Sequence, residues 1–288
     1  MLQIARLSPN LLGDSCDLIR QFLTSQQLPG GGFADRSGNS DLYYTVFGLE
    51  SFLALRSDPP LCETADYLRR FGDGDGLDFV HLACLGRCWA TVCHGDFRQA
   101  PREAILERLE KFRSQDGGYA QTRGAATGTA YAAFLVLGAY EDFQVPLPEP
   151  ERLLDSLQSL RAADGAYSNQ PGAAYGLTTS TAAAVLLLRH LGQAPGVGVA
   201  GWLLERAHPQ GGFFALPDAP IPDLLSTATA LHALSAMQAP LEPIRESCLD
   251  FVDSLWTNRG GFYGSWADDT IDCEYTYYAL LSLGHLSL

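Results

Sequence analysis

Residues that could carry chemistry follow a glycine turn at several places in this chain. The stretch 30–44 begins Gly-Gly-Gly-Phe-Ala-Asp-Arg and ends Asp-Leu-Tyr-Tyr, so Arg36 and Asp41 stand just before an apolar run. An arginine guanidinium matches the geometry of a phosphate or a carboxylate. A carboxylate beside a histidine or a thiol can ligate a metal or transfer a proton. This stretch therefore predicts a polar site for an anion, a metal ion or a proton transfer.

The same pattern of glycine turn, aromatic residue and apolar run returns through the chain. The aromatic residue stands at positions 33, 119, 167, 213 and 262, and a divergent copy with an acidic turn occupies 72–79. A period of about 40 to 50 residues is typical of a repeat array. The chain is therefore predicted to be one domain, residues 1–288, built of six repeats.

Each repeat combines two kinds of segment. Before a turn, as in 102–112, apolar residues fall at helical spacing on one face, which predicts a surface helix. After a turn, as in 178–191, the segment is apolar on nearly every side, which is typical of a buried helix. Alternation of the two predicts an all-α, (α/α)6 toroid, with a barrel of six inner helices inside six outer helices.

Composition excludes some functions. The chain has 33 acidic and 19 basic residues, a net charge of −14, and Lys111 as its only lysine. Such a charge disfavours binding to nucleic-acid phosphates or to an anionic membrane surface. Seven cysteines at irregular spacing, no signal-peptide pattern and no long apolar run predict a reduced, cytoplasmic protein without a membrane span.

Polar residues precede the predicted inner helices. If these helices share one polarity, the residues that start them gather at one rim of the barrel. Asp, Ser and Thr are the preferred helix caps, so capping is the simplest interpretation of each of them. Helix dipoles pointing into the same rim would also favour an anion there. The residues are Asp41, Asp78, Thr127, Thr129, Thr178, Asp223, Ser226 and Asp272.

The repeated Gly-Gly-Phe-x-x-Arg followed by Asp-x-aromatic resembles the prenyltransferase and squalene cyclase repeat family through all six repeats. By eye it is most similar to protein prenyltransferase β subunits, such as that of the Rab geranylgeranyl enzyme. The resemblance implies an isoprenoid diphosphate, or another hydrophobic small molecule, bound in the barrel. It also implies prenyl transfer and a helical-repeat partner subunit.

The resemblance also implies which residues bind the substrate. Arg36 is at the position of a diphosphate-contacting arginine, and Arg123 is a second candidate. Magnesium could accompany a diphosphate. Aromatic residues on the inner helices would line the pocket for the prenyl chain. The candidates are Tyr43, Phe47, Tyr275 and Tyr278.

A zinc ion is implied in the same way. Asp41, Tyr44 and His81 match family positions, but Tyr43 stands where the family has its cysteine ligand. The thiol would then come from Cys273, which neighbours the first repeat if the ring closes. The expected zinc ligands are Asp41, His81 and Cys273, and the expected catalytic residues are Asp41, Tyr44, His81 and Asp272.

Two further functions stay open. One is a non-catalytic toroid that binds a lipid or a protein partner. The other is an enzyme resembling a class II terpene cyclase, because residues 266–270 are similar to the acidic motif with which such enzymes protonate an alkene. The acid would then be Asp268, Asp269 or Asp272.

Overall fold

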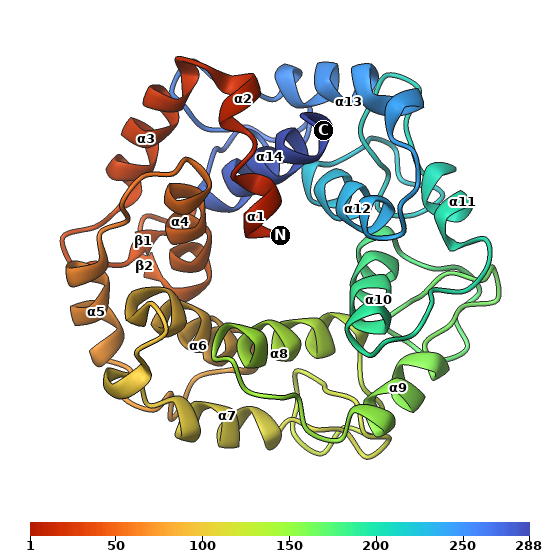
Figure 1. The fold of residues 1–288 in the computed structure, drawn as a ribbon, viewed down its shortest axis with the longest axis horizontal. Coiled ribbons are helices and arrows are strands. Elements are labelled where there is room, and N and C mark those ends of the chain that lie inside the picture. Colours follow the sequence, from red (N-terminus) through yellow and green to blue (C-terminus); the bar gives the residue numbers. More distant parts are fainter. The chain divides into compact units, whose positions relative to one another are not determined.

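The computed structural model describes residues 1–288, which form helices joined by loops and one short hairpin. The chain forms two compact units (Figure 1). Unit 1 contains Met1–Pro60 and Ala200–Leu288, and unit 2 contains Leu61–Val199. None of the helices combines the length and the apolar character that crossing a membrane requires.

Unit 1 contains the first and last elements of the chain. Strands β1 and β2 pair antiparallel, with Phe33 opposite Asp41. Helix α11, Val199–Leu204, begins at the last residue of unit 2 and continues into unit 1. The other elements are α1 (Leu2–Ala5), α2 (Pro9–Leu12), α3 (Ser15–Gln26), β1 (Phe33–Ala34), β2 (Ser40–Asp41), α4 (Leu42–Ala54), α12 (Leu224–Ala236), α13 (Glu242–Ser254) and α14 (Cys273–Leu286).

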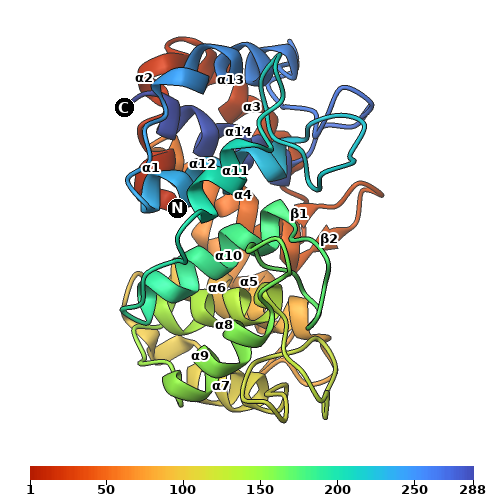
Figure 2. The ribbon, with the colours of Figure 1, turned by 90° about the vertical axis from the view of Figure 1, so that its right-hand side faces the viewer.

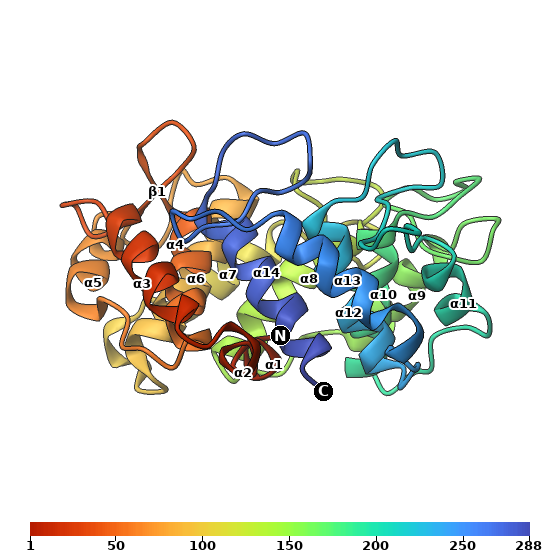
Figure 3. The ribbon, with the colours of Figure 1, turned by 90° about the horizontal axis from the view of Figure 1, so that it is seen from above.

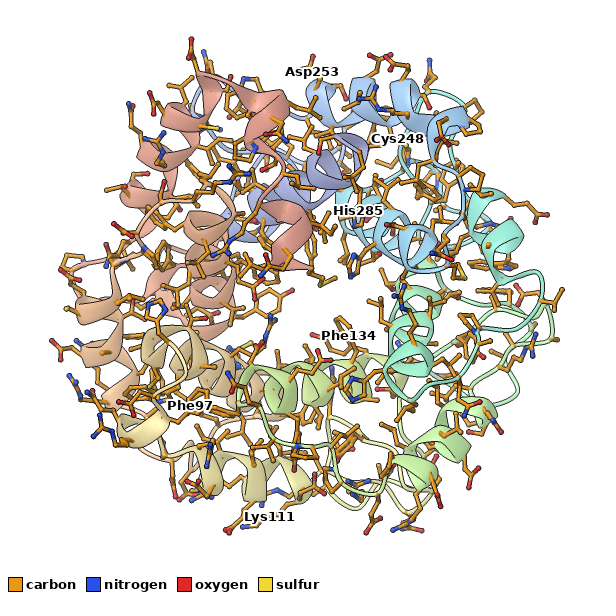
Figure 4. The ribbon with its side chains drawn as sticks, in the orientation of Figure 1. Phe97, Lys111, Phe134, Cys248, Asp253 and His285 are labelled. Atoms are coloured by element: carbon orange, nitrogen blue, oxygen red, sulfur yellow. The ribbon has the colours of Figure 1, made fainter.

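Helix α14 is the centre of unit 1. It packs against α4 and α12, with α1 and α13 also in contact. Most of its residues are buried, as expected for a helix that is apolar on nearly every side. Helix α13 is amphipathic instead: Cys248 is fully buried and Asp253 is exposed (Figure 4). This is the predicted alternation of inner and outer helices.

Unit 2 repeats the same arrangement. Helix α8 packs against α6 and α10, and Figure 2 shows α7 and α9 along the same side of α8. The half-buried Phe134 belongs to α8, whereas Lys111 is the exposed residue that follows α7 as its C-cap (Figure 4). The elements are α5 (Leu61–Arg69), α6 (Phe79–Cys93), η1 (Phe97–Gln99), α7 (Arg102–Glu110), α8 (Ala130–Asp142), α9 (Pro150–Ser159) and α10 (Thr178–His190).

Side-chain caps start five of the six inner helices. The capping prediction is confirmed for Asp41, Asp78, Thr129, Asp223 and Asp272, each of which accepts a hydrogen bond from the backbone N–H three residues ahead. Helix α10 is the exception, because it begins after Leu177 without a side-chain cap. The chain before the first glycine turn forms two helices, α2 and α3, separated at Gly13, whose φ is 52°.

The turn before each inner helix is fixed by its aromatic residue. Phe33, Tyr119 and Phe213 are completely buried. A threonine hydroxyl inside the following helix accepts the N–H of that aromatic residue in three repeats. The pairs are Thr45 with Phe33 at 3.0 Å, Thr181 with Tyr167 at 3.1 Å and Thr227 with Phe213 at 2.9 Å. At Gly211 a side chain would collide with the Ser247 carbonyl, so the turn there requires glycine.

Candidate functional site

The starts of α4 and α14 carry a cluster of charged and aromatic side chains. Figure 3 shows the β1–β2 hairpin and the loop between α13 and α14 side by side at one end of unit 1. The hairpin leads into α4 and the loop leads into α14. Both helices begin at a capping aspartate, so this end of unit 1 brings together residues that follow two different glycine turns.

Arg36 joins the hairpin to the loop. Its Nε donates to Asp272 Oδ2 at 2.7 Å, and its Nη1 and Nη2 donate to Asp268 at 3.3 and 2.8 Å. The guanidinium also lies 5.2 Å from the centre of the Tyr275 ring. Charge-assisted bonds of this kind are shorter and stronger than neutral ones. Arg36 therefore fixes both segments and the ring between them.

The same loop is also held from within. The backbone N–H groups of Gly264 and Thr270 donate to Asp268 at 3.1 and 3.3 Å. Gly264 lies so close to the ring of Tyr275 that a Cβ there would collide with it. Tyr275 is thus held between Gly264 and Arg36, which leaves its ring little freedom to turn.

The two aspartates that bind Arg36 differ in their pKa. Burial alone would raise the pKa of Asp268, but the bonds from Arg36 and from two backbone N–H groups lower it below its ordinary value. Burial raises the pKa of Asp272 despite its bonds from the Tyr275 N–H and from Arg36. Asp268 is therefore held as a carboxylate, which makes it a poor proton donor.

Glu274 is the acid in this cluster that can hold a proton at neutral pH. Its Oε1 accepts a hydrogen bond of 2.6 Å from the Tyr43 hydroxyl. Burial raises the pKa of Glu274 to about 7; the Tyr43 bond lowers it, the charge of Asp272 raises it, and Arg36 lowers it. A group with a pKa near the working pH is present in both protonation states, as a general acid or base requires.

The Tyr43 ring, whose hydroxyl binds this carboxyl, belongs to a row of aromatic rings. Residues four apart lie on one face of a helix, which puts Tyr43 beside Phe47 on α4, and Glu274 beside Tyr278 on α14. The ring centres of Tyr43 and Phe47 are 4.9 Å apart, and those of Phe47 and Tyr278 are 5.4 Å apart. Phe47 also lies 5.8 Å from Tyr277. Helical spacing therefore assembles an aromatic surface next to an acid that can hold a proton at neutral pH.

The phenols of the cluster stay protonated. Burial, followed by the charges of Asp272 and Glu274, raises the pKa of Tyr44, and Arg36 opposes that shift. Burial and then Glu274 raise the pKa of Tyr275 to about 12. These hydroxyls can therefore donate hydrogen bonds but carry no charge at neutral pH.

Most of the residues predicted to bind substrate lie in this one cluster of unit 1. Arg36 occupies it in a different role from the expected one, because two carboxylates already hold its guanidinium. Asp41 caps α4, accepting from the Tyr44 N–H at 3.1 Å. The predicted residues in the cluster are Arg36, Tyr43, Tyr44, Phe47, Asp272, Tyr275 and Tyr278.

Two predicted site residues belong to unit 2. The ring Nδ1 of His81 is 2.7 Å from Asp78 Oδ2, and Asp78 caps α6. The guanidinium of Arg123 lies 5.1 Å from the centre of the Phe112 ring. Asp269 of unit 1, a further candidate acid, accepts a hydrogen bond of 3.0 Å from the Thr270 hydroxyl.

The side chains do not fit the zinc set that the family resemblance implies. Zinc binds the thiolate form of cysteine. Cys273 is completely buried, and burial followed by the charge of Asp272 raises its thiol pKa well above the ordinary value. No three His, Cys, Asp or Glu side chains of the chain are grouped so that they could hold a metal ion. We therefore derive no chemistry through zinc.

Glu274 was absent from the residues predicted to form the site. It stands in the first turn of α14, where acids are common because they complement the helix dipole. Its signal in the sequence is weak: it is the one acid within an otherwise uncharged segment from Cys273 to Gly284. Its pKa depends on Tyr43, which is 231 residues away in the chain.

Comparison with known families gives a match over almost the whole chain. A family model described as "prenyltransferase alpha-alpha toroid domain" matches residues 7–83, 71–206 and 181–287. No curated protein sequence is similar enough to be assigned as a relative.

Solved structures of several activities have a similar fold. The type II terpene cyclase MstE from Scytonema, in complex with geranylgeranyl dihydroxybenzoate, is 15% identical over 97% of both chains, with a TM-score of 0.65. Protein geranylgeranyltransferase-I of Candida albicans, complexed with GGPP, is 13% identical over 93% of this chain and 90% of that one, with a TM-score of 0.69. An α-1,6-mannanase of Salegentibacter is 14% identical over 95% and 99%, with a TM-score of 0.64.

These similarities confirm the predicted all-α toroid fold class. They do not select one activity, because a cyclase, a transferase and a glycosidase have comparable scores. One fold supports many functions, so the function depends on the residues of the site.

Proposed function

This chain belongs to the prenyltransferase α/α-toroid family, and from that premise we propose that it acts on an isoprenoid and begins the reaction by donating a proton from Glu274. The observation that carries the proposal is the contact between the Glu274 carboxyl and the Tyr43 hydroxyl, at 2.6 Å, because the Tyr43 ring begins the row of rings formed with Phe47 and Tyr278. Burial raises the pKa of this carboxyl to about 7. The two isoprenoid-related structures, one with a geranylgeranyl dihydroxybenzoate and one with GGPP, support the choice of substrate class.

The proton transfer proceeds as follows. The O–H bond of Glu274 breaks, and the π electrons of a substrate double bond form a new C–H bond with that proton. Glu274 becomes a carboxylate, and a tertiary carbocation forms on the substrate. Attack by the next double bond makes a ring, and the final cation loses a proton to water or another base.

Tyr43 assists the step by its position. Its hydroxyl donates to Oε1 of Glu274, so the other oxygen is the one that carries the transferable proton. The same hydrogen bond stabilises the carboxylate that remains, which makes the protonated form a stronger acid than burial alone would. The faces of Phe47, Tyr277 and Tyr278 can stabilise the developing cation.

Prenyl transfer from a diphosphate fits this cluster less well. That reaction needs positive groups on the leaving diphosphate. The arginine expected to provide one is bonded to both Asp268 and Asp272. One experiment can distinguish proton donation by Glu274 from prenyl transfer, because the two reactions give different products.

The test compares the wild-type protein with Glu274→Gln in D2O, using geranylgeraniol as the probe and mass spectrometry of the products. We expect the wild type to give cyclic products that contain deuterium from solvent. Glu274→Gln should lower their rate of formation about 100-fold or more, because general acid catalysis contributes at least that factor. Glu246→Gln, on exposed α13, is the matched control and should keep the wild-type rate.

Two results contradict proton donation. One is an unchanged rate in Glu274→Gln; the other is product without deuterium. Release of diphosphate from geranylgeranyl diphosphate, with transfer of the prenyl group to a thiol, would support the transferase instead. Tight binding of geranylgeraniol with no reaction in either protein would support a non-catalytic lipid-binding toroid.

A further inference from the structure

The charged side chains around Glu274 affect which head group of a substrate can bind there. Asp223, Asp268 and Asp272 lie with Glu274 in unit 1, and all but Asp268 influence the pKa of Tyr275. Asp268 in turn acts on the pKa of Asp272. Arg36 is the only basic side chain that forms an ion pair with any of these four acids.

Arg36 has little capacity left for another anion. Three of its N–H groups already donate to carboxylate oxygens, at 2.7, 2.8 and 3.3 Å. Its single positive charge faces two carboxylates, so the group of three carries a net negative charge. Like charges placed together disfavour binding, and a partly buried site screens that repulsion less than water does.

The negative charge has the opposite effect on a cation. A field that repels a diphosphate also stabilises positive charge that develops on the substrate during protonation. The uncharged phenols of Tyr44 and Tyr275 can donate hydrogen bonds to a neutral oxygen. Both the negative charge and the hydrogen-bond donors therefore favour an uncharged head group that contains an oxygen.

We infer that this site accepts an isoprenoid whose head group is uncharged, such as an alcohol, and rejects the corresponding diphosphate. Asp268 and Asp272 set this preference by neutralising Arg36. The inference rests on the proposed action on isoprenoids and deepens it. It also places the reaction after a step that removes the diphosphate, because isoprenoid chains that carry one would bind poorly.

The experiment measures binding of a matched pair that cannot react as alkenes: hexahydrofarnesol and hexahydrofarnesyl diphosphate. Calorimetry with the wild-type protein, in EDTA and at low salt, gives both dissociation constants. We expect the alcohol to bind at least about 10-fold more tightly, with the ratio decreasing as added salt screens the charges. Asp268→Asn should shift the ratio of the two dissociation constants about 10-fold toward the diphosphate. Asp253→Asn, an exposed acid on α13, should change neither constant.

Several results would overturn the inference. They are tighter or equal binding of the diphosphate, tightening of its binding by Mg²⁺ to the level of the alcohol, or no response to Asp268→Asn. Failure of both ligands to bind would overturn the proposed function as well. The two proposals can also fail separately. Loss of turnover in Glu274→Gln, with tighter binding of the diphosphate than of the alcohol, would overturn only the head-group preference. Unchanged turnover in Glu274→Gln, with tighter binding of the alcohol, would overturn only proton donation by Glu274.

Discussion

The two units of this protein use the acid of the repeat at different positions. In two repeats of unit 2 the acid lies in the turn, three residues before the aromatic residue, as Asp116 and Asp164; the divergent repeat at 72–79 instead has Asp78 as a helix cap, as in unit 1. Asp116 accepts hydrogen bonds from the N–H of Gly118 and Gly128 and from the hydroxyls of Ser114 and Ser156. Asp164 binds the equivalent backbone groups, the N–H of Ala166 and Gly176. These turn acids are fully engaged in holding their own loops.

In unit 1 the acid lies at the helix cap. The turn position there is Gly30, Gln210 or Arg259, and the cap, eight or ten residues after the aromatic residue, is an aspartate. A cap needs one carboxylate oxygen for the helix N–H and leaves the other for a different partner. In Asp272, Oδ1 caps α14 and Oδ2 binds Arg36.

The two positions of the acid differ in how many of its oxygens remain for partners outside the turn. The turn acids have their oxygens bonded to groups of the loop, so their position serves folding. The cap acid Asp272 binds Arg36 together with Asp268, and Arg36 with Tyr43 lowers the pKa of Glu274 against the effect of burial. The turn acids of unit 2 therefore serve folding, whereas Asp272 of unit 1 also positions an arginine beside the proposed proton donor.

The largest expected effect on stability comes from removing a turn acid. Asp116→Ala leaves three donor groups of its loop and the Ser156 hydroxyl of α9 without their acceptor, and unsatisfied buried donors cost about 1 to 3 kcal/mol each. We expect a decrease of about 3 kcal/mol in the free energy of unfolding, measured by urea denaturation. Asp155→Ala, an exposed acid on α9, is the control and should have no effect. A loss below about 1 kcal/mol would show that the turn does not depend on its acid.

The second prediction concerns pH and Glu274. Its pKa is raised from 4.5 to about 7 in the folded protein, so the folded state holds the proton more tightly than the unfolded state does. The resulting stabilisation is complete below pH 4.5 and is lost as the pH rises through 7. It amounts to at most about 3 kcal/mol by linkage.

This pH dependence has to be measured against a variant. Burial lowers the pKa of His285 from 6.5 to about 4, with a further contribution from the N-terminal amine, so its effect has the opposite sign (Figure 4). Its stabilising contribution is present above pH 6.5 and is lost as the pH falls through 4. The difference between wild type and Glu274→Gln removes this background. We expect that difference to change with pH between 4.5 and 7, and a constant difference would contradict the shifted pKa.

The smallest effect is expected for the caps themselves. Asp223→Ala and Thr129→Ala each remove one cap, from α12 in unit 1 and α8 in unit 2. Each should lower the free energy of unfolding by about 1 kcal/mol. Thermal unfolding can measure both. If either loss matched that of Asp116→Ala, the distinction between turn acids and cap acids would fail.

Much of the fold was predictable because its signals are local. Glycine turns, capping residues and the alternation of apolar with amphipathic segments can all be recognised within about 15 residues. The exceptions have local causes as well: a glycine with positive φ divides the first outer helix, and Leu177 replaces the cap of α10.

The site was predictable only in part. Tyr43, Phe47, Tyr275 and Tyr278 were expected there because they lie on or near the predicted inner helices, where the family resemblance implies a pocket lined by aromatic residues. Arg36 was expected to bind an anion, but in the structure it binds Asp268 and Asp272. These partners are more than 230 residues away in the chain, so the sequence around Arg36 does not reveal them. The pKa of Glu274 depends on burial and on a hydrogen bond from another helix, and neither can be read from its neighbours in the sequence.

The most direct test of the account is a titration of Glu274 itself. Carboxyl carbons labelled with ¹³C in glutamate can be followed by NMR, and Glu274→Gln identifies the resonance. The account predicts a midpoint near pH 7, and a still higher one in Tyr43→Phe, because the Tyr43 hydrogen bond lowers the pKa. A midpoint near the ordinary value of 4.5 in the wild type would contradict the role of Glu274 as a proton donor.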